Sequence, residues 1–310
     1  MSETAGKPPR ISLQELKKRA AKADLSETEI RAYFAEDKEN SEPFRPAVKV
    51  DSQNVDTGGK APTPKQISEL YQQATRTPKK SVAGAVPVSQ PRPLTATAKT
   101  MAKSLKAKGA RVLGEGDSWF NLPAFIFPPT ALDILGETHD VRSIAMWGDE
   151  LDNMVGTKQY LQPLKSGAFR HFLFSGGGND VLGSIGKFVK NRKPGDTDPA
   201  NAPGYVSADF AVKIAAMMEL YKTLANDVRI ATLGGTVLYV YGYADALPRK
   251  NGPYIGTPLA AKGFDPDAVG PLAKAIVKHM VAMFNTALKT FAAAHSGVVY
   301  VDVRSAMNAS

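Results

Sequence analysis

Three glycine-containing polar motifs between residues 114 and 180 of this 310-residue chain each hold a group that can hydrogen-bond a ligand. Residues 114–120 read GEGDSWF, residues 146–149 read MWGD and residues 175–180 read SGGGND. In the first motif, a serine in a glycine-flanked turn can expose its hydroxyl and gather backbone N–H groups. A glycine in the second lets its own N–H approach a ligand, and an asparagine amide in the third can donate. Each motif alone is ordinary turn chemistry, so their placement decides the interpretation.

The elements that position these motifs follow from the apolar pattern beyond residue 100. Five apolar, β-rich runs alternate there with helical segments. The runs span 110–114, 141–146, 171–175, 236–241 and 297–303, and the helical segments span 130–135, 150–164, 181–189, 207–226 and 271–294. This alternation predicts right-handed βαβ crossovers and a parallel sheet covered by helices on both faces. Ligands of such sheets bind at the carboxyl ends of the strands, and all three motifs fall there.

The ordered set GDSW, strand-end glycine and GGND resembles the first three signature blocks of the SGNH/GDSL hydrolases, over about residues 105–303. The resemblance implies an α/β, three-layer α/β/α flavodoxin-like fold with a five-stranded parallel sheet in residues 101–310. It also implies serine-dependent hydrolysis of small-molecule esters, in the manner of esterases, lipases and acetylesterases, without a cofactor or metal. Neither the acyl group nor the alcohol can be read from the residues.

The resemblance also assigns roles to individual residues. Ser118 would be the nucleophile and would carry the acyl group in an acyl-enzyme. The N–H of Gly148 and the side chain of Asn179 would join the N–H of Ser118 in an oxyanion hole. Asp117 and Asp180 are expected to shape the turns rather than to do chemistry.

The fourth block of that family, an Asp-x-x-His after the fifth strand, has no counterpart here. The last run is followed by Asp302, and no D-x-x-H occurs before Ser310. Three of the four histidines stand at the amino ends of predicted strands and one lies inside the last helix: His139, His171, His295 and His279. No general base is therefore found among them. Two explanations stay open, a domain that is C-terminally incomplete and lacks its usual final helix, or a catalytically impaired family member.

The N-terminal third has a different composition. Residues 1–100 are poor in large apolar residues, which predicts a largely disordered extension with one or two short helices, starting near Ser12 and Ser26. Residues 51–98 have the composition of a linker. Residues 1–110 hold 20 Lys and Arg against 12 Asp and Glu, so the net charge of +9 resides mainly there. We expect this basic arm either to dock an acidic partner or to have no dedicated role, and we expect no nucleic-acid-binding fold.

The composition of the chain narrows the classes of protein to which it can belong. The chain has no cysteine, no run long enough for a membrane helix and no apolar leader, which predicts a cytoplasmic protein, although export by another route stays open. A rival to the hydrolase is a non-catalytic module that holds an acyl or sugar ligand in the same pocket. A nucleotide-binding protein is a weaker alternative, because the first motif has neither the G-x-G-x-x-G nor the GK[ST] spacing.

Overall fold

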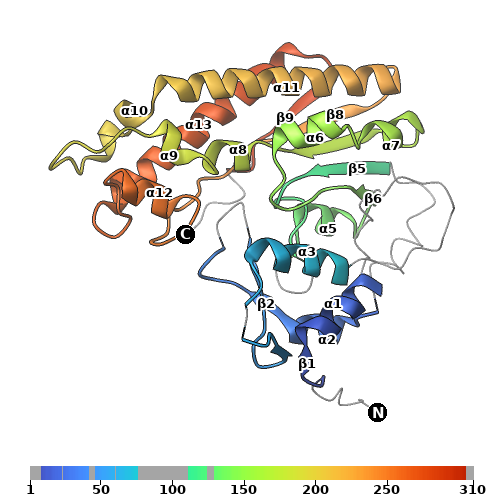
Figure 1. Ribbon diagram of the computed structural model, residues 1–310. Helices are drawn as coiled ribbons and strands as arrows, with labels where there is room; N and C mark the ends of the chain where they lie inside the picture. Colours follow the sequence, from blue (N-terminus) through green and yellow to red (C-terminus); the bar gives the residue numbers. More distant parts are fainter. Residues whose placement is uncertain are drawn as a thin grey trace.

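A five-stranded parallel sheet forms the centre of the computed structural model, which describes residues 8–22, 24–41, 46–59, 61–75, 111–123 and 129–304. The strands are β5 (Arg111–Gly116), β6 (Asp140–Ser143), β7 (His171–Ser175), β8 (Val237–Tyr241) and β9 (Val298–Val301). Their order across the sheet is β6-β5-β7-β8-β9 (Figure 1), which in chain order is the 2-1-3-4-5 arrangement of flavodoxin-like folds. The predicted fold class is confirmed.

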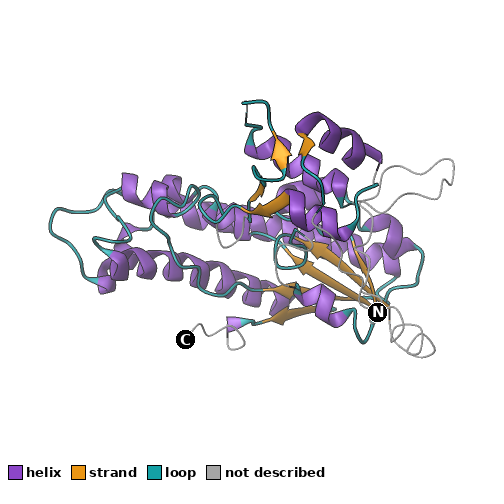
Figure 2. Ribbon diagram, turned by 90° about the horizontal axis from the view of Figure 1, so that it is seen from below, coloured by secondary structure: helices purple, strands orange, loops and turns teal. Residues whose placement is uncertain are grey.

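Helices cover both faces of this sheet, because alternate strand residues are apolar on each side. Phe172 and Phe174 on β7 face the larger core, whereas Leu173 between them joins a smaller core with Leu132. Figure 1 shows α11 and α13 on one side of the sheet and α5 on the other, and Figure 2 shows the two long helices side by side. The helices are α5 (Ala131–Leu135), α6 (Leu151–Thr157), α7 (Leu161–Lys165), α8 (Gly178–Leu182), α9 (Ile185–Phe188), α10 (Ala202–Tyr205), α11 (Ala208–Thr232), α12 (Gly256–Ala261) and α13 (Gly270–Ala294).

Residues 8–75 form a second folded part, which we call the N-terminal unit. It contains β1 (Ile11–Ser12), α1 (Leu13–Lys22), α2 (Glu27–Tyr33), β2 (Phe34–Glu36), β3 (Val48–Val50), β4 (Val55–Asp56) and α3 (Pro64–Ala74). Strand β1 pairs with β4, and β2 pairs with β3. The unit has a buried core of its own, made of Leu16, Ala20, Ile30, Tyr33, Phe34, Val48, Val55, Ile67, Leu70, Tyr71 and Ala74.

The two helices predicted for this region are present. Ser12 Oγ accepts a hydrogen bond from the Glu15 N–H at the start of α1, and Ser26 with Glu29 forms the capping box of α2. The expected linker over 51–98 is wrong as far as residue 75, because β4 and α3 form there. Helix α3 begins with Thr63 as its cap and a proline in its first turn, and buries four apolar residues at spacings of three and four.

Some predictions concern parts outside the described residues. Residues 76–110 carry eight Lys and Arg and no acidic residue, so the basic segment with its predicted acidic partner remains a prediction. No helix follows β9 within the described residues, which end at Arg304. Within those same ranges, no helix combines the length and apolar character needed to cross a bilayer.

Gly116 is required where β5 meets β7, which can be tested by adding a methyl group. A Cβ at Gly116 would lie 2.6 Å from the carbonyl oxygen of Ser175 on the paired strand. We expect Gly116→Ala to lower the free energy of unfolding in urea by about 1–3 kcal/mol, because the backbone must shift. Gly156→Ala is the matched control: a Cβ there meets nothing within 4 Å on helix α6, and we expect a gain of about 0.5–1 kcal/mol. Equal effects of the two substitutions would contradict this account.

Candidate active site

Ser118 lies in the turn directly after β5, at the carboxyl edge of the sheet, and is 5% exposed. The turn is held by the fully buried carboxylate of Asp117. This carboxylate accepts hydrogen bonds from the N–H of Trp119 (3.1 Å), the hydroxyl of Ser175 (3.1 Å) and the hydroxyl of Tyr243 (2.5 Å). The Asp117 N–H also donates to the Ser175 carbonyl at 3.0 Å. The residue before the candidate nucleophile thus ties the turn to the ends of β7 and β8.

The turn with Gly148 lies beside the Ser118 turn. Gly148 has a φ of +76°, which an L side chain rarely adopts. On one side of it, the Met146 N–H donates to the Gly116 carbonyl at 2.8 Å; on the other, the side-chain amide of Asn179 donates to the Asp149 carbonyl at 2.7 Å. The second motif is therefore bonded to both other motifs.

Asn179 lies in the first turn of α8 and is 1% exposed. The preceding Gly177 has a φ of +104°, and a Cβ there would lie 2.7 Å from Met217 and 2.9 Å from Phe284. The chain therefore turns sharply between β7 and α8, which directs Asn179 back to the sheet edge. Its Oδ1 is buried and has no hydrogen-bond partner among the described residues. The structure thus brings all three sequence-predicted residues, Ser118, Gly148 and Asn179, to one edge.

Asp180 shapes the neighbouring backbone, as the sequence suggested. One of its carboxylate oxygens accepts the Leu151 N–H at 2.9 Å, and the other accepts Lys213 Nζ at 3.1 Å. Glu150, Asp152 and Asp180 have carboxylate oxygens within 4.8 Å of one another. Both Asp180 oxygens already have partners within the protein, so this acidic cluster does not by itself indicate a metal ion.

Sequence reasoning missed three residues of the site: Glu115, Ser175 and Tyr243. Glu115 is buried on β5, and its Oε2 has no hydrogen-bond partner among the described residues. Burial first, and then the nearby charge of Asp149, raise the pKa of Glu115 well above its usual value. Tyr243 follows β8 at the carboxyl edge of the sheet. The rule that ligands bind at the carboxyl ends of parallel strands, which singled out the three motifs, therefore also applied to Tyr243.

Three of the four histidines, His139, His171 and His295, stand near the amino ends of strands. His171 begins β7 and pairs in register with Val112, whereas the other end of that ladder pairs Ser175 with Gly116. His171 and Ser175, at the two ends of this ladder, lie four residue steps apart along the strand, which is about 13 Å. The other histidines have partners elsewhere or lie on α13: His139 near Thr138, His295 stacked on Phe291, and His279. We therefore assign no histidine as the base for Ser118.

Asp302 follows β9 where the family pattern places an aspartate. Arg304 donates to both of its carboxylate oxygens, at 2.9 and 2.5 Å. This hydrogen bonding lowers the pKa of Asp302 to about 2 and keeps its carboxylate ionised.

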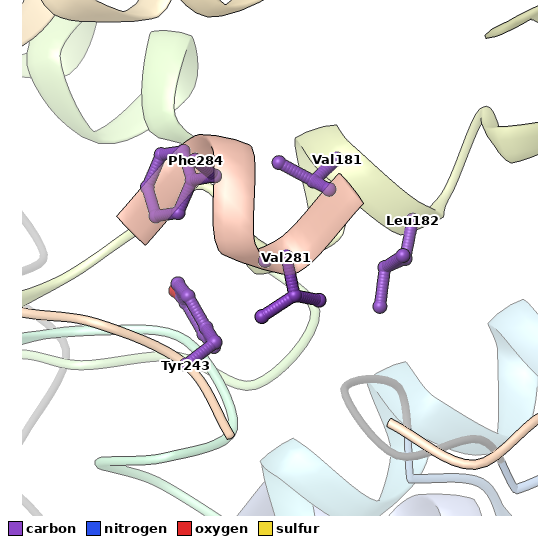
Figure 3. A pocket seen from close by; sticks show the side chains of 6 residues that line it. Val181, Leu182, Tyr243, Val281 and Phe284 are labelled. Atoms are coloured by element: carbon purple, nitrogen blue, oxygen red, sulfur yellow. The ribbon is translucent and has the colours of Figure 1, made fainter. Parts of the chain in front are cut away.

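An apolar cavity lies between α8, α13 and Tyr243 (Figure 3). Its volume is about 10 Å³, and it is lined by Gly178, Val181, Leu182, Tyr243, Val281 and Phe284. A pocket for a small-molecule ligand usually has roughly 300–1,000 Å³. This cavity is a packing gap next to the site and is too small to hold an acyl chain.

The fold and this edge together define an α/β protein of flavodoxin-like topology with a serine turn at the carboxyl edge of its sheet. No family model matches the sequence, and no curated protein matches it significantly. Among solved structures, the chain is similar to phospholipase A1 from Streptomyces albidoflavus NA297, with 14% identity over 64% of this chain and 81% of that chain and a TM-score of 0.40. It is also similar to TesA, with 18% identity over 58% of this chain and 99% of that chain and a TM-score of 0.26. Since both TM-scores lie below 0.5, these similarities establish no activity for this chain.

The buried carboxyl of Asp117 makes stability depend on pH. Burial raises its pKa from 3.8 to about 6, although its three hydrogen bonds oppose the shift. At pH values between 3.8 and about 6, the folded state therefore binds more protons than the unfolded state. The free energy of unfolding should fall by about 3 kcal/mol from this group as the pH rises from below 4 to above 6.

Urea denaturation of the wild type and Asp117→Asn across pH 4–7.5 tests this dependence. We expect a flatter pH dependence in the variant, because Asn does not titrate. Tyr243→Phe keeps the carboxyl but removes one donor, so the dependence should persist and move to higher pH. Identical profiles for the wild type and Asp117→Asn would contradict the assignment.

Proposed function

We propose that this chain is an SGNH-type ester hydrolase in which Ser118 forms an acyl-enzyme. The observation that carries the proposal is the meeting of the three turns at one sheet edge, with Asp117 holding the serine turn and Asn179 hydrogen-bonded beside Gly148. Ligands of parallel α/β sheets bind at this edge. The N–H groups of Ser118 and Gly148 and the amide of Asn179 are the proposed donors to the oxyanion.

The proposed reaction has two steps. The Ser118 hydroxyl attacks the ester carbonyl, its proton passes to a base, and the C–O bond to the alcohol breaks as the alcohol takes a proton. Water then attacks the acyl-enzyme and releases the carboxylic acid and Ser118. We assign no side chain as the base. An oxyanion hole and substrate binding alone still give about 10³–10⁴-fold acceleration over water in a serine protease without its base.

An external base provides a direct test with the chain as it is. We expect slow hydrolysis of p-nitrophenyl acetate that rises with the concentration of neutral imidazole, since imidazole can accept the Ser118 proton. A positioned base contributes about 10²–10⁴-fold, so free imidazole should recover part of that factor. Imidazole also cleaves this ester by itself, and Ser118→Ala measures that background. Equal rates for wild type and Ser118→Ala at every imidazole concentration, with no fluorophosphonate labelling of Ser118, would refute the proposal.

The role of Asn179 gives a second prediction. Asn179→Ala removes one oxyanion donor, so we expect kcat for the Ser118-dependent reaction to fall about 100- to 1,000-fold with little change in KM. The free energy of unfolding should be measured alongside, because the amide also bonds the Asp149 carbonyl. A folded Asn179→Ala variant with wild-type kcat would exclude Asn179 from the oxyanion hole.

The lack of an Asp-x-x-His block after β9 favours a second candidate, a binding module that holds an acyl or sugar ligand without turnover. This module should bind carboxylates or acylated sugars with an affinity that survives Ser118→Ala. The hydrolase should instead lose both labelling and imidazole-dependent turnover in that variant. Calorimetry with acetate and with an acetylated sugar, beside the imidazole assay, separates the two candidates.

A further inference from the structure

Two contacts among the described residues join the N-terminal unit to the α/β part of the chain. Trp147 packs against the core of the unit, and its ring lies 5.9 Å from that of Tyr71 on α3, at an interplanar angle of 70°. Tyr71 is itself fully buried and lies edge-on to Phe34, at 5.1 Å. The second contact is made by the Arg249 guanidinium, which donates to the backbone carbonyls of Glu39 (3.3 Å) and Ser41.

These two contacts lie on either side of the candidate active site. Trp147 belongs to the loop that leaves the carboxyl end of β6, and Arg249 belongs to the loop that leaves the carboxyl end of β8. In the sheet order β6-β5-β7-β8-β9, these strands flank β5 and β7, which lead into Ser118 and Asn179. The N-terminal unit is therefore attached to the catalytic edge on both sides of the strands that carry the site.

The first contact acts on the backbone that supplies the Gly148 N–H. The peptide unit between Trp147 and Gly148 contains that N–H, so the placement of Trp147 sets the direction in which it points. A Cβ at Gly148 would meet no atom within 4 Å, so the space on that side of the peptide is open. The hydrogen bonds from Met146 and to Asp149 hold the turn from either side. Between these two hydrogen bonds, Trp147 is held by its ring contact with Tyr71.

We propose that the N-terminal unit is a cap attached over the carboxyl edge of the sheet, and that Tyr71, acting through Trp147, is a positioning residue for the Gly148 N–H. Tyr71 does not touch the substrate in this proposal. Its ring fixes the indole of Trp147, and the indole fixes the peptide unit that donates to the oxyanion. The positioning role rests on the proposed function, whereas the attachment of the cap does not.

Tryptophan fluorescence tests the attachment without any substrate. The chain has two tryptophans, so Trp119→Phe leaves Trp147 as the single reporter. In that background, Tyr71→Ala should shift the emission to longer wavelength and raise acrylamide quenching, because the indole loses its buried neighbour. Tyr71→Phe keeps the ring and should leave both unchanged. Wild-type emission and quenching in a folded Tyr71→Ala variant would overturn the proposal.

Arg249→Gln removes the second contact without altering either core, so it covers the case in which Tyr71→Ala does not fold. We expect higher acrylamide quenching of Trp147 in this variant as well, since the cap then loses its hydrogen bonds to the loop after β8. Unchanged quenching would mean that the unit is not held across the edge, which would also overturn the cap.

Kinetics test the positioning role in chains that keep both tryptophans. We expect Tyr71→Ala to lower kcat of the Ser118-dependent reaction about 10- to 100-fold with a small change in KM, because a misplaced donor affects the transition state more than the bound ester. Tyr71→Phe should restore kcat. Leu16→Ala is the matched control, a truncation in the same core on another helix, and should keep wild-type kcat while folded.

The outcomes separate the two proposals. A shifted Trp147 emission with wild-type kcat in Tyr71→Ala, or an equal loss of kcat in Leu16→Ala, overturns the positioning role. No Ser118-dependent turnover in the wild type refutes the proposed function and the positioning role together. The emission result still decides whether the cap is attached, because it is measured without substrate.

Discussion

The carboxylate of Asp117 is the interaction on which the geometry of the edge depends. It lies in the protein interior, where an unpaired charge would be costly, and three donors from three separate parts of the chain surround it. One donor closes the turn that carries Ser118, another comes from the end of β7, and the third is Tyr243 after β8. Any rotation of the serine turn would leave buried donors without an acceptor, at about 1–3 kcal/mol for each group. The turn therefore has one low-energy arrangement.

The Gly148 and Asn179 turns are held in a similar way, by backbone groups that bond across the edge. The Met146 N–H reaches the Gly116 carbonyl, and the Asn179 amide reaches the Asp149 carbonyl. These bonds are possible because glycines allow close approach: a Cβ at Gly116 would meet Ser175, and a Cβ at Gly177 would meet Phe284. The glycines in the motifs thus serve strand pairing and chain reversal, and the polar groups next to them are positioned as a consequence.

Local sequence was sufficient to predict the sheet and the three turns, because each depends on residues close together in the chain. The periodicity of the apolar runs located all five strands to within a few residues, and the serine-glutamate spacing at Ser26 located the start of α2. The contact between Tyr243 and Asp117, 126 residues apart, leaves no comparable local pattern. The N-terminal unit was missed for a related reason. Its core is small and is collected from six short elements, so the average composition of residues 1–100 concealed it.

The proposed oxyanion would form at an edge that also carries acidic residues, so the charge of these residues bears on the proposal. Glu115 and Asp149 lie close enough to affect each other, and two ionised carboxylates beside the proposed oxyanion donors would repel an oxyanion. Burial raises the pKa of both groups, and that of Glu115 rises well above its usual value. The raised pKa of Glu115 favours its neutral form over its ionised form. The burial that makes Glu115 costly to ionise thus lessens the repulsion that the proposed oxyanion would meet.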